Sequence, residues 1–177
     1  MLISALNIKA KFVLDFWFNY RADKLKIMHI NLIDYFNCKE FKYNNIFLDD
    51  YVLTPFQPEL FSDKEYVHYN CFPASRIGSV DVFVNSFRFI PKLSFLLYKK
   101  STEEYIGSAD IQKIFGIYCL TNVAVLPRFR GSGLGKFLVN KALIETFNND
   151  VKDLFLLVRP NNERAMNLYN SVGFDYI

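Results

Sequence analysis

The sequence is poor in the residues that build disulfide frameworks and metal centres. Its 177 residues include two histidines, His29 and His68, and three cysteines, Cys38, Cys71 and Cys119. The cysteine number is odd and no two cysteines have C-x-x-C spacing, which argues against a disulfide-stabilised secreted domain and a typical zinc site. We therefore expect reduced thiols, no bound metal and a cytoplasmic location.

Strong charge and long apolar runs are also missing. The net charge is only +3, and no block of Lys and Arg resembles those that follow a nucleic-acid backbone. No uncharged apolar segment approaches the roughly 18 residues that a membrane-spanning helix needs. The apolar start MLISALNI is followed by Lys9, Lys11 and Asp15 and makes a poor signal peptide. These absences predict no nucleic-acid partner and no membrane partner.

Hydrophobic residues are plentiful, at 51% of the chain, with 19 Phe and 11 Tyr. This composition allows a sizeable core, and the length fits a single domain over residues 1–177. We interpret the aromatic excess as ordinary core and surface residues. Met28 is a possible second start, so residues 1–27 are a possible extension of the domain.

The stretch from Thr121 to Lys136 is the most informative part of the chain. It reads TNVAVLPRFRGSGLGK, an apolar strand-like run followed by two arginines and three glycines at alternate positions. The periodicity predicts a helix over 134–148 with an apolar face made of Leu134, Phe137, Leu138, Ala142 and Ile144. A strand that turns through glycines into a helix presents backbone N–H groups at the positive end of the helix dipole. This geometry binds phosphate.

The spacing of the glycines separates three kinds of phosphate site. A P-loop needs G-x-x-x-x-G-K-[ST], whereas only three residues separate Gly131 from Gly135 and Phe137 replaces the hydroxyl residue. A dinucleotide site needs G-x-G-x-x-G, whereas this chain has G-x-G-x-G. These mismatches disfavour a nucleotide-binding domain. The pattern R-x-x-G-x-G remains, and it fits twice, from Arg128 to Gly133 and from Arg130 to Gly135.

This motif resembles the acyl-CoA-binding segment of the GNAT superfamily of N-acyltransferases. A later stretch, Leu154 to Phe174, is similar to that family's pattern V-x-x-x-N-x-x-A-x-x-L-Y-x-x-x-G-F. Every named place is filled, by Val158, Asn162, Ala165, Leu168, Tyr169, Gly173 and Phe174. The resemblance covers residues 93–174. It implies an α/β (α+β) GNAT fold, with a mixed, mostly antiparallel central sheet that splays at the CoA cleft and is flanked by helices.

Local patterns within this segment predict its elements. Leu93–Tyr98, Tyr105–Phe115 and Ile117–Leu126 are expected to form an antiparallel meander, with a bulge at Gly107 and a turn at Gly116. A strand at 154–158 and a helix at 162–172 follow. Asn161 or Asn162 is expected to cap that helix and Gly173 to end it.

The first ninety residues are harder to interpret. Residues 3–16 fit a strand or a helix, and Leu25–Phe41 is more helix-like. Tyr51–Ser75 is expected to be loop with short helical pieces, and Ile77–Phe89 a helix that Pro91 ends. The family has a further strand after the Gly-Phe pair. Here that strand is a stub, is missing, or comes from a partner chain.

The resemblance also implies the binding residues for acetyl-CoA, a co-substrate. Backbone N–H groups from Arg130 to Lys136 would hold the diphosphate, and the side chains of Arg128 and Arg130 reach either phosphate or solvent. The β-strand backbone would pair with the pantetheine arm, and Asn162 would contact that arm. The expected cofactor-binding residues are Val123, Ala124, Val125, Arg128, Arg130, Gly131, Ser132, Gly133, Leu134, Gly135, Lys136 and Asn162.

By the same resemblance Tyr169 is the catalytic residue, a phenol that protonates the departing thiolate. The base is left open, because Thr121 and Leu157 occupy the places where relatives have glutamate. Other candidates are a loop histidine, three carboxylates on the preceding hairpin that are expected to be solvated, and a water relay. They are His68, Glu103, Glu104, Asp110, and water held by Asn122 or Tyr118.

The implied function is an N-acetyltransferase in which a primary amine attacks acetyl-CoA directly in a ternary complex. The sequence L-T-N-V-A-V-x-P is similar to a segment of the enzymes that acetylate the α-amine of ribosomal proteins. A protein N-terminus, a lysine and a small-molecule amine all stay open as acceptors. The alternative is a non-catalytic acyl-CoA-binding regulatory module. A monomer and a homodimer are both compatible with the sequence.

Overall fold

The computed structural model describes residues 8–10, 25–38, 49–72, 80 and 84–177. These residues form a seven-stranded sheet in the order β2-β3-β4-β5-β6-β1-β7. The strands are β1 (Lys26–Asn31), β2 (Tyr51–Pro55), β3 (Phe89–Lys99), β4 (Glu104–Ile114), β5 (Ile117–Val125), β6 (Asp153–Val158) and β7 (Asp175–Tyr176). Every neighbouring pair is antiparallel except β5 and β6, which are parallel. The expected mixed, mostly antiparallel sheet is confirmed.

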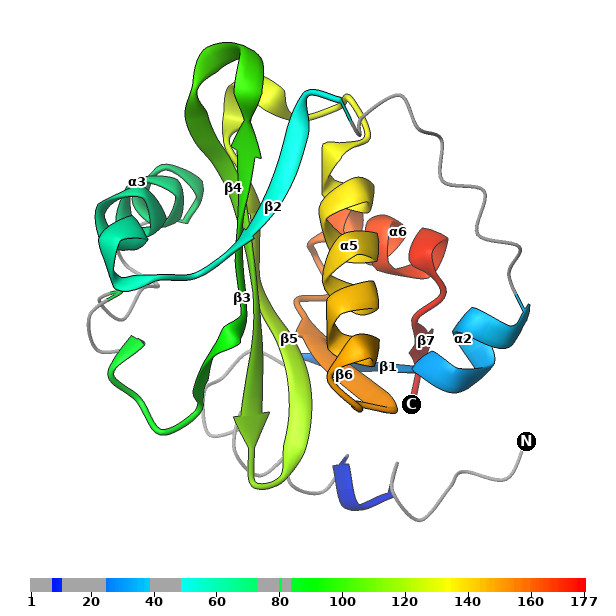
Figure 1. Ribbon diagram of the computed structural model, residues 1–177. Coiled ribbons are helices and arrows are strands. Elements are labelled where there is room, and N and C mark those ends of the chain that lie inside the picture. The colour runs from blue at the N-terminus through cyan, green and yellow to red at the C-terminus, as the bar shows by residue number, and fades with distance from the viewer. Residues whose placement is uncertain (1–7, 11–24, 39–48, 73–79, 81–83) are drawn as a thin grey trace.

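Helices cover both faces of this sheet. They are α2 (Leu32–Cys38), α3 (Phe61–Cys71), α5 (Leu134–Asn148) and α6 (Glu163–Val172), and the short 3₁₀ turns are η2 (Pro58–Leu60), η4 (Lys100–Thr102) and η5 (Pro127–Phe129). Figure 1 shows α3 on one side of β3, β4 and β5, and α5 on the other. The main core lies between the sheet and α5. On α5, Leu143 is buried and Ile144 only half-buried, so the apolar face lies slightly to one side of the predicted one.

The predicted meander is confirmed as β3, β4 and β5. Phe115 and Gly116 both have positive φ, 47° and 84°, in the turn between β4 and β5. Leu97 pairs with Gly107 but Tyr98 pairs with Tyr105, so β4 has a bulge next to Gly107. A Cβ on Gly107 would lie 2.7 Å from the Ala124 carbonyl oxygen, and the glycine therefore lets β5 approach β4 closely.

The helix predicted over 25–41 is wrong in its first part, where the chain forms β1. This strand lies between β6 and β7, and Ile27, Met28 and Ile30 are buried. A strand that is covered on both faces loses its apolar–polar alternation, which is why this segment resembled a helix. The helical part is α2, within residues 32–38. Residues 3–16 lie outside the described part except Ile8–Ala10, which are helical.

Two further predictions in the first half need partial correction. The segment expected to be loop with short helical pieces, Tyr51–Ser75, contains the helical segments η2 and α3, but it also contains strand β2, which was not expected. The helix expected over 77–89 lies partly outside the described residues; Val80 and Val84 are helical, but the chain turns at 85–88, and Pro91 falls inside β3 instead of ending the helix. The β3–β4 register shifts between Phe89 and Ser94, so Pro91 occupies an irregular part of the ladder where a missing N–H is tolerated.

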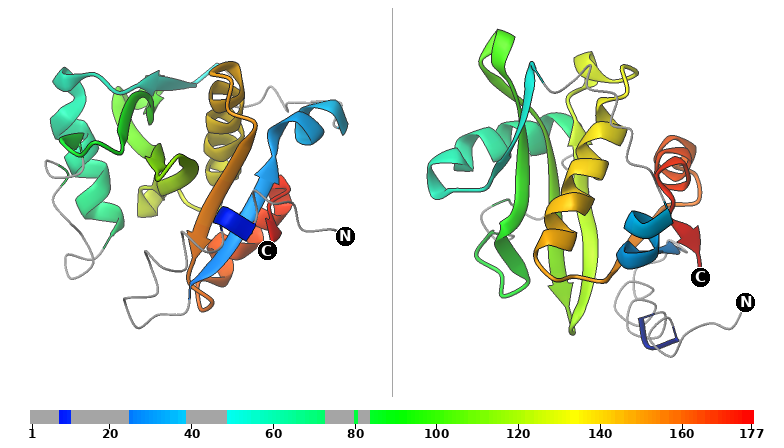
Figure 2. Two further views of the ribbon diagram at one scale, coloured as in Figure 1. Left: turned by 90° about the horizontal axis from the view of Figure 1, so that it is seen from below. Right: turned by 45° about the vertical axis from the view of Figure 1, so that its right-hand side comes forward.

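The C-terminal strand is a stub. β7 has two residues, and it pairs with β1 and not with β6. The place beside β6 is taken by β1 from the other end of the chain, which pairs with β6 along six residues (Figure 2). Lys26 and Ile27 belong to this strand, so the described sheet begins before Met28. Among the described helices, none is both long and apolar enough to cross a membrane.

Candidate functional site

The parallel strands β5 and β6 part halfway along their length. They pair only at Cys119–Phe155 and Leu120–Leu156, although β5 continues to Val125 and β6 to Val158. We call the region beyond these pairs the β5–β6 parting. The Leu126 N–H donates to the Ile106 carbonyl of β4 at 2.8 Å. Because backbone groups alternate along a strand, the N–H and C=O of Val125 point the other way, into the parting.

The glycine loop connects this end of β5 to α5. Gly131 and Gly133 adopt left-handed backbone conformations, with φ of 89° and 87°. Gly133 is the N-cap of α5 and offers no side-chain oxygen, and the first helical bond runs from the Phe137 N–H to the Gly133 carbonyl at 3.1 Å. The N–H groups of 134–136 precede that bond, as at any helix start. This combination of left-handed glycines and an uncapped helix start is suited to an anion.

The structure requires glycine at position 131 but not at position 135. A Cβ on Gly131 would have nothing within 4 Å, so only its positive φ demands glycine in the structure. A Cβ on Gly135 would lie 3.5 Å from the Leu168 side chain of α6, which is an ordinary van der Waals contact. Ser132 turns its hydroxyl back to the Phe129 carbonyl at 2.9 Å and closes the loop locally.

The two arginines of the motif have protein partners. Arg128 forms an exposed ion pair with Glu104, and its pKa is raised by hydrogen bonding to Tyr66 and by Glu104. The Arg130 Nε donates to the Val125 carbonyl at 2.7 Å. Arg130 is therefore held against the end of β5, next to the parting.

Helix α6 places the two other predicted site residues. The Asn162 Oδ1 accepts the Ala165 N–H at 3.2 Å, which confirms Asn162 as the helix cap. Gly173 ends the helix with φ of 117°, and its N–H and that of Phe174 both bond to the Tyr169 carbonyl. The Tyr169 ring packs edge-on to Phe174, with 5.9 Å between centroids. Burial raises the pKa of the Tyr169 phenol to about 12.

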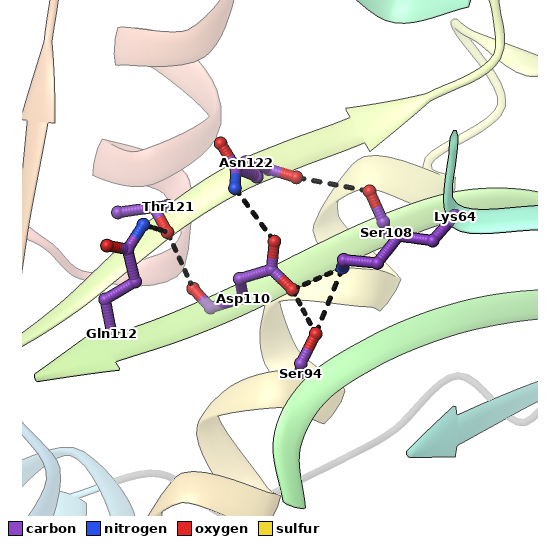
Figure 3. A network of polar contacts seen from close by, with 7 residues as sticks. All are labelled: Lys64, Ser94, Ser108, Asp110, Gln112, Thr121 and Asn122. Carbon is purple, nitrogen blue, oxygen red and sulfur yellow. Dashed lines mark hydrogen bonds and ion pairs between the residues drawn. The ribbon is translucent and has the colours of Figure 1, made fainter. Parts of the chain in front are cut away.

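Asp110 was expected to be a solvated surface group, and this is wrong. It is 1% exposed and belongs to β4, with its side chain on the face that α3 covers. Figure 3 shows its carboxylate between three side chains. One oxygen accepts from the Lys64 ammonium at 2.6 Å and from the Ser94 hydroxyl, and the other accepts from the Asn122 amide at 2.9 Å. The only sequence signal for this cluster was the alternation that puts Ser108 and Asp110 on one face of β4.

His68 was expected in a loop, and it lies in α3, one turn after Lys64. Its Nε2 is buried without a hydrogen-bond partner in the part of the chain that is described. Burial, the largest cause, lowers the pKa of the His68 imidazole, so the ring is neutral near pH 7. Glu103 is exposed in a turn with φ of 52°, and Glu104 is paired with Arg128.

The described residues contain no group of His, Cys, Asp and Glu side chains that could hold a metal ion. Within the same residues Cys71 and Cys119 are free thiols. Burial raises the pKa of the Cys119 thiol to about 12, so this thiol stays protonated.

Comparison with known proteins agrees with this arrangement. Residues 45–174 match the model of the family described as Acetyltransferase (GNAT) family. Over 74 residues the chain is 35% identical to a [Ribosomal protein bS18]-alanine N-acetyltransferase of Haemophilus influenzae, covering 42% of this chain and 50% of the relative. The chain therefore spans about half the length of this curated relative.

Two solved structures show the same fold. A GCN5-related N-acetyltransferase from Sphaerobacter thermophilus superposes with a TM-score of 0.68 at 18% identity, covering 86% of this chain and 48% of that one. The structure of AAC(6')-Iy in complex with the bisubstrate analogue CoA-S-monomethyl-acetylneamine superposes with a TM-score of 0.58 at 16% identity, covering 71% and 90%.

Proposed function

The chain belongs to the acetyltransferase (GNAT) family, and we propose that it transfers an acetyl group from acetyl-CoA to a primary amine. One observation carries this proposal: a loop with two left-handed glycines runs into the uncapped start of α5, beside the β5–β6 parting. The loop supplies a place for the diphosphate, and the parting supplies unpaired strand backbone for the pantetheine arm.

The diphosphate would be bound by the main chain of residues 130–136. Left-handed glycines turn successive N–H groups toward one point, and the α5 dipole adds positive potential there. The open space around Gly131 leaves room for phosphate oxygens. We assign this role to the loop backbone and not to Arg128, whose side chain is paired with Glu104.

The pantetheine arm would lie along β5 in the parting, in contact with the backbones of Val123, Ala124 and Val125. The Val125 carbonyl already accepts from Arg130, so the Val125 N–H is the group left to bind a carbonyl of the arm. Asn162, at the start of α6, would contact the arm from the other side. Its Oδ1 is used by the helix cap, and its amide N–H groups are the donors for this contact.

Tyr169 would act on the leaving sulfur. The amine nitrogen attacks the thioester carbon, the C–S bond breaks, and the sulfur leaves with the bonding electrons. A phenol with a pKa of about 12 is protonated throughout the neutral range. This value lies above the ~8.5 of an ordinary thiol, so Tyr169 donates a hydrogen bond to the developing thiolate while the net proton comes from the attacking amine.

The acceptor class is a primary amine, and two kinds are represented among the similar proteins. The Haemophilus influenzae relative is named for an alanine amine of a ribosomal protein, whereas AAC(6')-Iy was solved with an analogue of a small-molecule amine. A direct assay must therefore offer both.

The test is thiol release from acetyl-CoA with a panel of amines. The panel contains a peptide beginning with alanine, the same peptide with a blocked N-terminus and one lysine, and a polyamine. We expect thiol release that depends on the amine, with a product heavier by one acetyl group in mass spectrometry. Binding of CoA without turnover of any amine would contradict the catalytic proposal and favour a binding module.

A further inference from the structure

Strand β5 has an irregularity at the point where it leaves β6. Ser108 pairs with Ala124 and Asp110 with Thr121, so two steps on β4 match three steps on β5. The extra residue lies between Thr121 and Ala124, a short way beyond Leu120, which is the last residue of β5 that pairs with β6. A bulge of this kind re-aims the strand that follows it. Here it precedes residues 123–125, and within that segment the N–H and C=O of Val125 point into the β5–β6 parting.

Asn122 in this bulge has φ of 50°, a conformation that residues with a Cβ rarely adopt. Its surroundings hold it there from two sides. The Asn122 side-chain amide donates to Asp110 at 2.9 Å, and the backbone carbonyl of Asn122 accepts from the Ser108 hydroxyl at 3.3 Å. Asparagine is suited to this place because its short polar side chain tolerates the left-handed region.

The Asp110 carboxylate is itself fixed from behind. Lys64, 3% exposed, donates to Asp110 at 2.6 Å and to Ser94 at 3.0 Å, and Ser94 also donates to Asp110. Lys64 comes from α3 and Ser94 from β3, so two further elements hold one side chain of β4 (Figure 3). We call Lys64, Ser94 and Asp110 the Asp110 clamp.

We propose that the Asp110 clamp holds Asn122 in its left-handed conformation and so positions the backbone of β5 that binds the acyl carbonyl of acetyl-CoA. This inference rests on the proposed function, and it makes Lys64, Asp110 and Asn122 positioning residues that act through the main chain. A buried ion pair is weak evidence for stability, because an apolar pair of similar size is often as stable. The orientation that the clamp imposes on Asn122 gives this ion pair a second role.

The test uses a double variant, Lys64→Met with Asp110→Leu, which removes the clamp without leaving a buried unpaired charge. Calorimetry compares the binding of acetyl-CoA and of CoA, and neither measurement requires a known amine. We expect the wild-type protein to bind acetyl-CoA roughly tenfold more tightly than CoA, as one additional hydrogen bond would give. In the double variant we expect the ratio of the acetyl-CoA affinity to the CoA affinity to fall toward one, while the CoA affinity itself stays within about twofold of the wild-type value.

A second pair of variants is independent of how well the double variant folds. Alanine in Asn122→Ala has a Cβ but no side-chain amide, so nothing offsets the strain of the positive φ. Glycine in Asn122→Gly has no Cβ and adopts this φ freely. We expect the ratio to fall in Asn122→Ala and to stay nearer the wild-type value in Asn122→Gly. The matched control is Asp153→Asn, a carboxylate of β6 that pairs with His29 and Asn31 far along the strand from Val158.

Each outcome supports or overturns the inference. An unchanged ratio in both the double variant and Asn122→Ala overturns it, and so does a wild-type ratio of one. An equal loss in Asp153→Asn also overturns it, because the effect would then be general destabilisation. If the affinity ratio changes as expected but no amine is acetylated, only the proposed function is overturned. A wild-type protein that binds neither molecule overturns both.

Discussion

Tyr169 carries the most specific chemical role that we assign to a single side chain. It lies one turn before the end of α6, and its phenol has a pKa of about 12 because burial disfavours the phenolate. The phenol therefore keeps its proton at every pH at which the protein is expected to work. In the proposed mechanism its contribution is a hydrogen bond that strengthens as charge develops on sulfur, and such a contribution would appear in the rate and not in substrate affinity.

We expect Tyr169→Phe to lower kcat by about 100-fold, the size typical of losing one positioned hydrogen-bond donor to a developing charge. The dissociation constant for CoA should stay within about twofold, since the ring and its contact with Phe174 remain. Steady-state kinetics and calorimetry on the same preparation measure both. A variant with unchanged kcat would remove Tyr169 from the mechanism.

His68 predicts a pH dependence of stability. Its folded pKa is lowered by burial below the ordinary value of about 6.5, so the unfolded chain binds a proton more readily. The stability that depends on neutral His68 is complete above pH ~6.5 and is lost as the pH falls through and below that value. We expect the wild-type unfolding temperature to decrease from pH 7.5 to 5.5 more steeply than that of His68→Gln, which does not titrate.

Thermal unfolding of the two proteins at matched ionic strength measures this difference. Parallel curves would show that His68 is solvated or charged in the folded protein. Glutamine keeps a polar group of similar reach at a position where the Nε2 is buried, so the comparison changes titration more than packing.

The individual residues differ in how far sequence alone could place them. Asn162 and Tyr169 were predictable because they belong to a local pattern within one helix and its cap. The contact between Lys64 and Asp110 joins residues 46 positions apart and depends on how α3 packs over β4. The burial of Asp110 was not visible in the local sequence, so this carboxylate was taken for a solvated surface group.

At the scale of elements, our proposal assigns the binding of acetyl-CoA to the strand–loop–helix unit from β5 to α5. The helix was predicted with its observed bounds, 134–148, because its apolar period, its glycine start and the preceding strand all agree. The parting of β5 from β6 was expected only by resemblance to the family. Strand separation depends on register, and no local pattern encodes it.

The loop can be tested with two glycines that share one conformation. Gly131 and Gly116 have φ of 89° and 84°, and a Cβ on either would have nothing within 4 Å. Alanine at either place should therefore cost a similar 1–2 kcal/mol of stability, since both force a Cβ residue into the left-handed region. Only Gly131→Ala is expected to weaken CoA binding, by tenfold or more, because its Cβ would face the diphosphate.

Chemical denaturation and CoA titration of both variants measure the two effects separately. Equal CoA affinity in Gly131→Ala and Gly116→Ala would show that the diphosphate does not bind at this loop. A loss of CoA affinity in both variants would show that the loss follows from a less stable fold and not from a lost contact with the diphosphate.

At the scale of the whole molecule, the two ends of the described chain meet in one sheet. Strand β1 lies between β6 and the two-residue β7, so the N-terminal strand closes the sheet where the C-terminal strand is short (Figure 1). This arrangement was not predictable, because the apolar spacing in and around β1 resembles that of a helix and the β6 partners of this strand lie more than 100 residues away. The central and C-terminal elements were predictable because their contacts are local.

We expect β1 to be part of a single cooperative unit. Met28 is 0% exposed and packs in the main core, so Met28→Ala should lower the free energy of unfolding by about 2–5 kcal/mol in one transition. The control Lys26→Ala, at an exposed place on the same strand, should change it by less than about 1 kcal/mol. Denaturation followed by circular dichroism and by tyrosine fluorescence measures both, and two separate transitions would contradict a shared core.

The most direct measurement is a crystal structure of the protein with CoA bound. We expect the diphosphate within hydrogen-bond distance of the N–H groups of residues 131–136, the pantetheine arm beside residues 123–125, and the sulfur next to the Tyr169 hydroxyl. A diphosphate bound elsewhere, or an arm that runs outside the β5–β6 parting, would contradict the account.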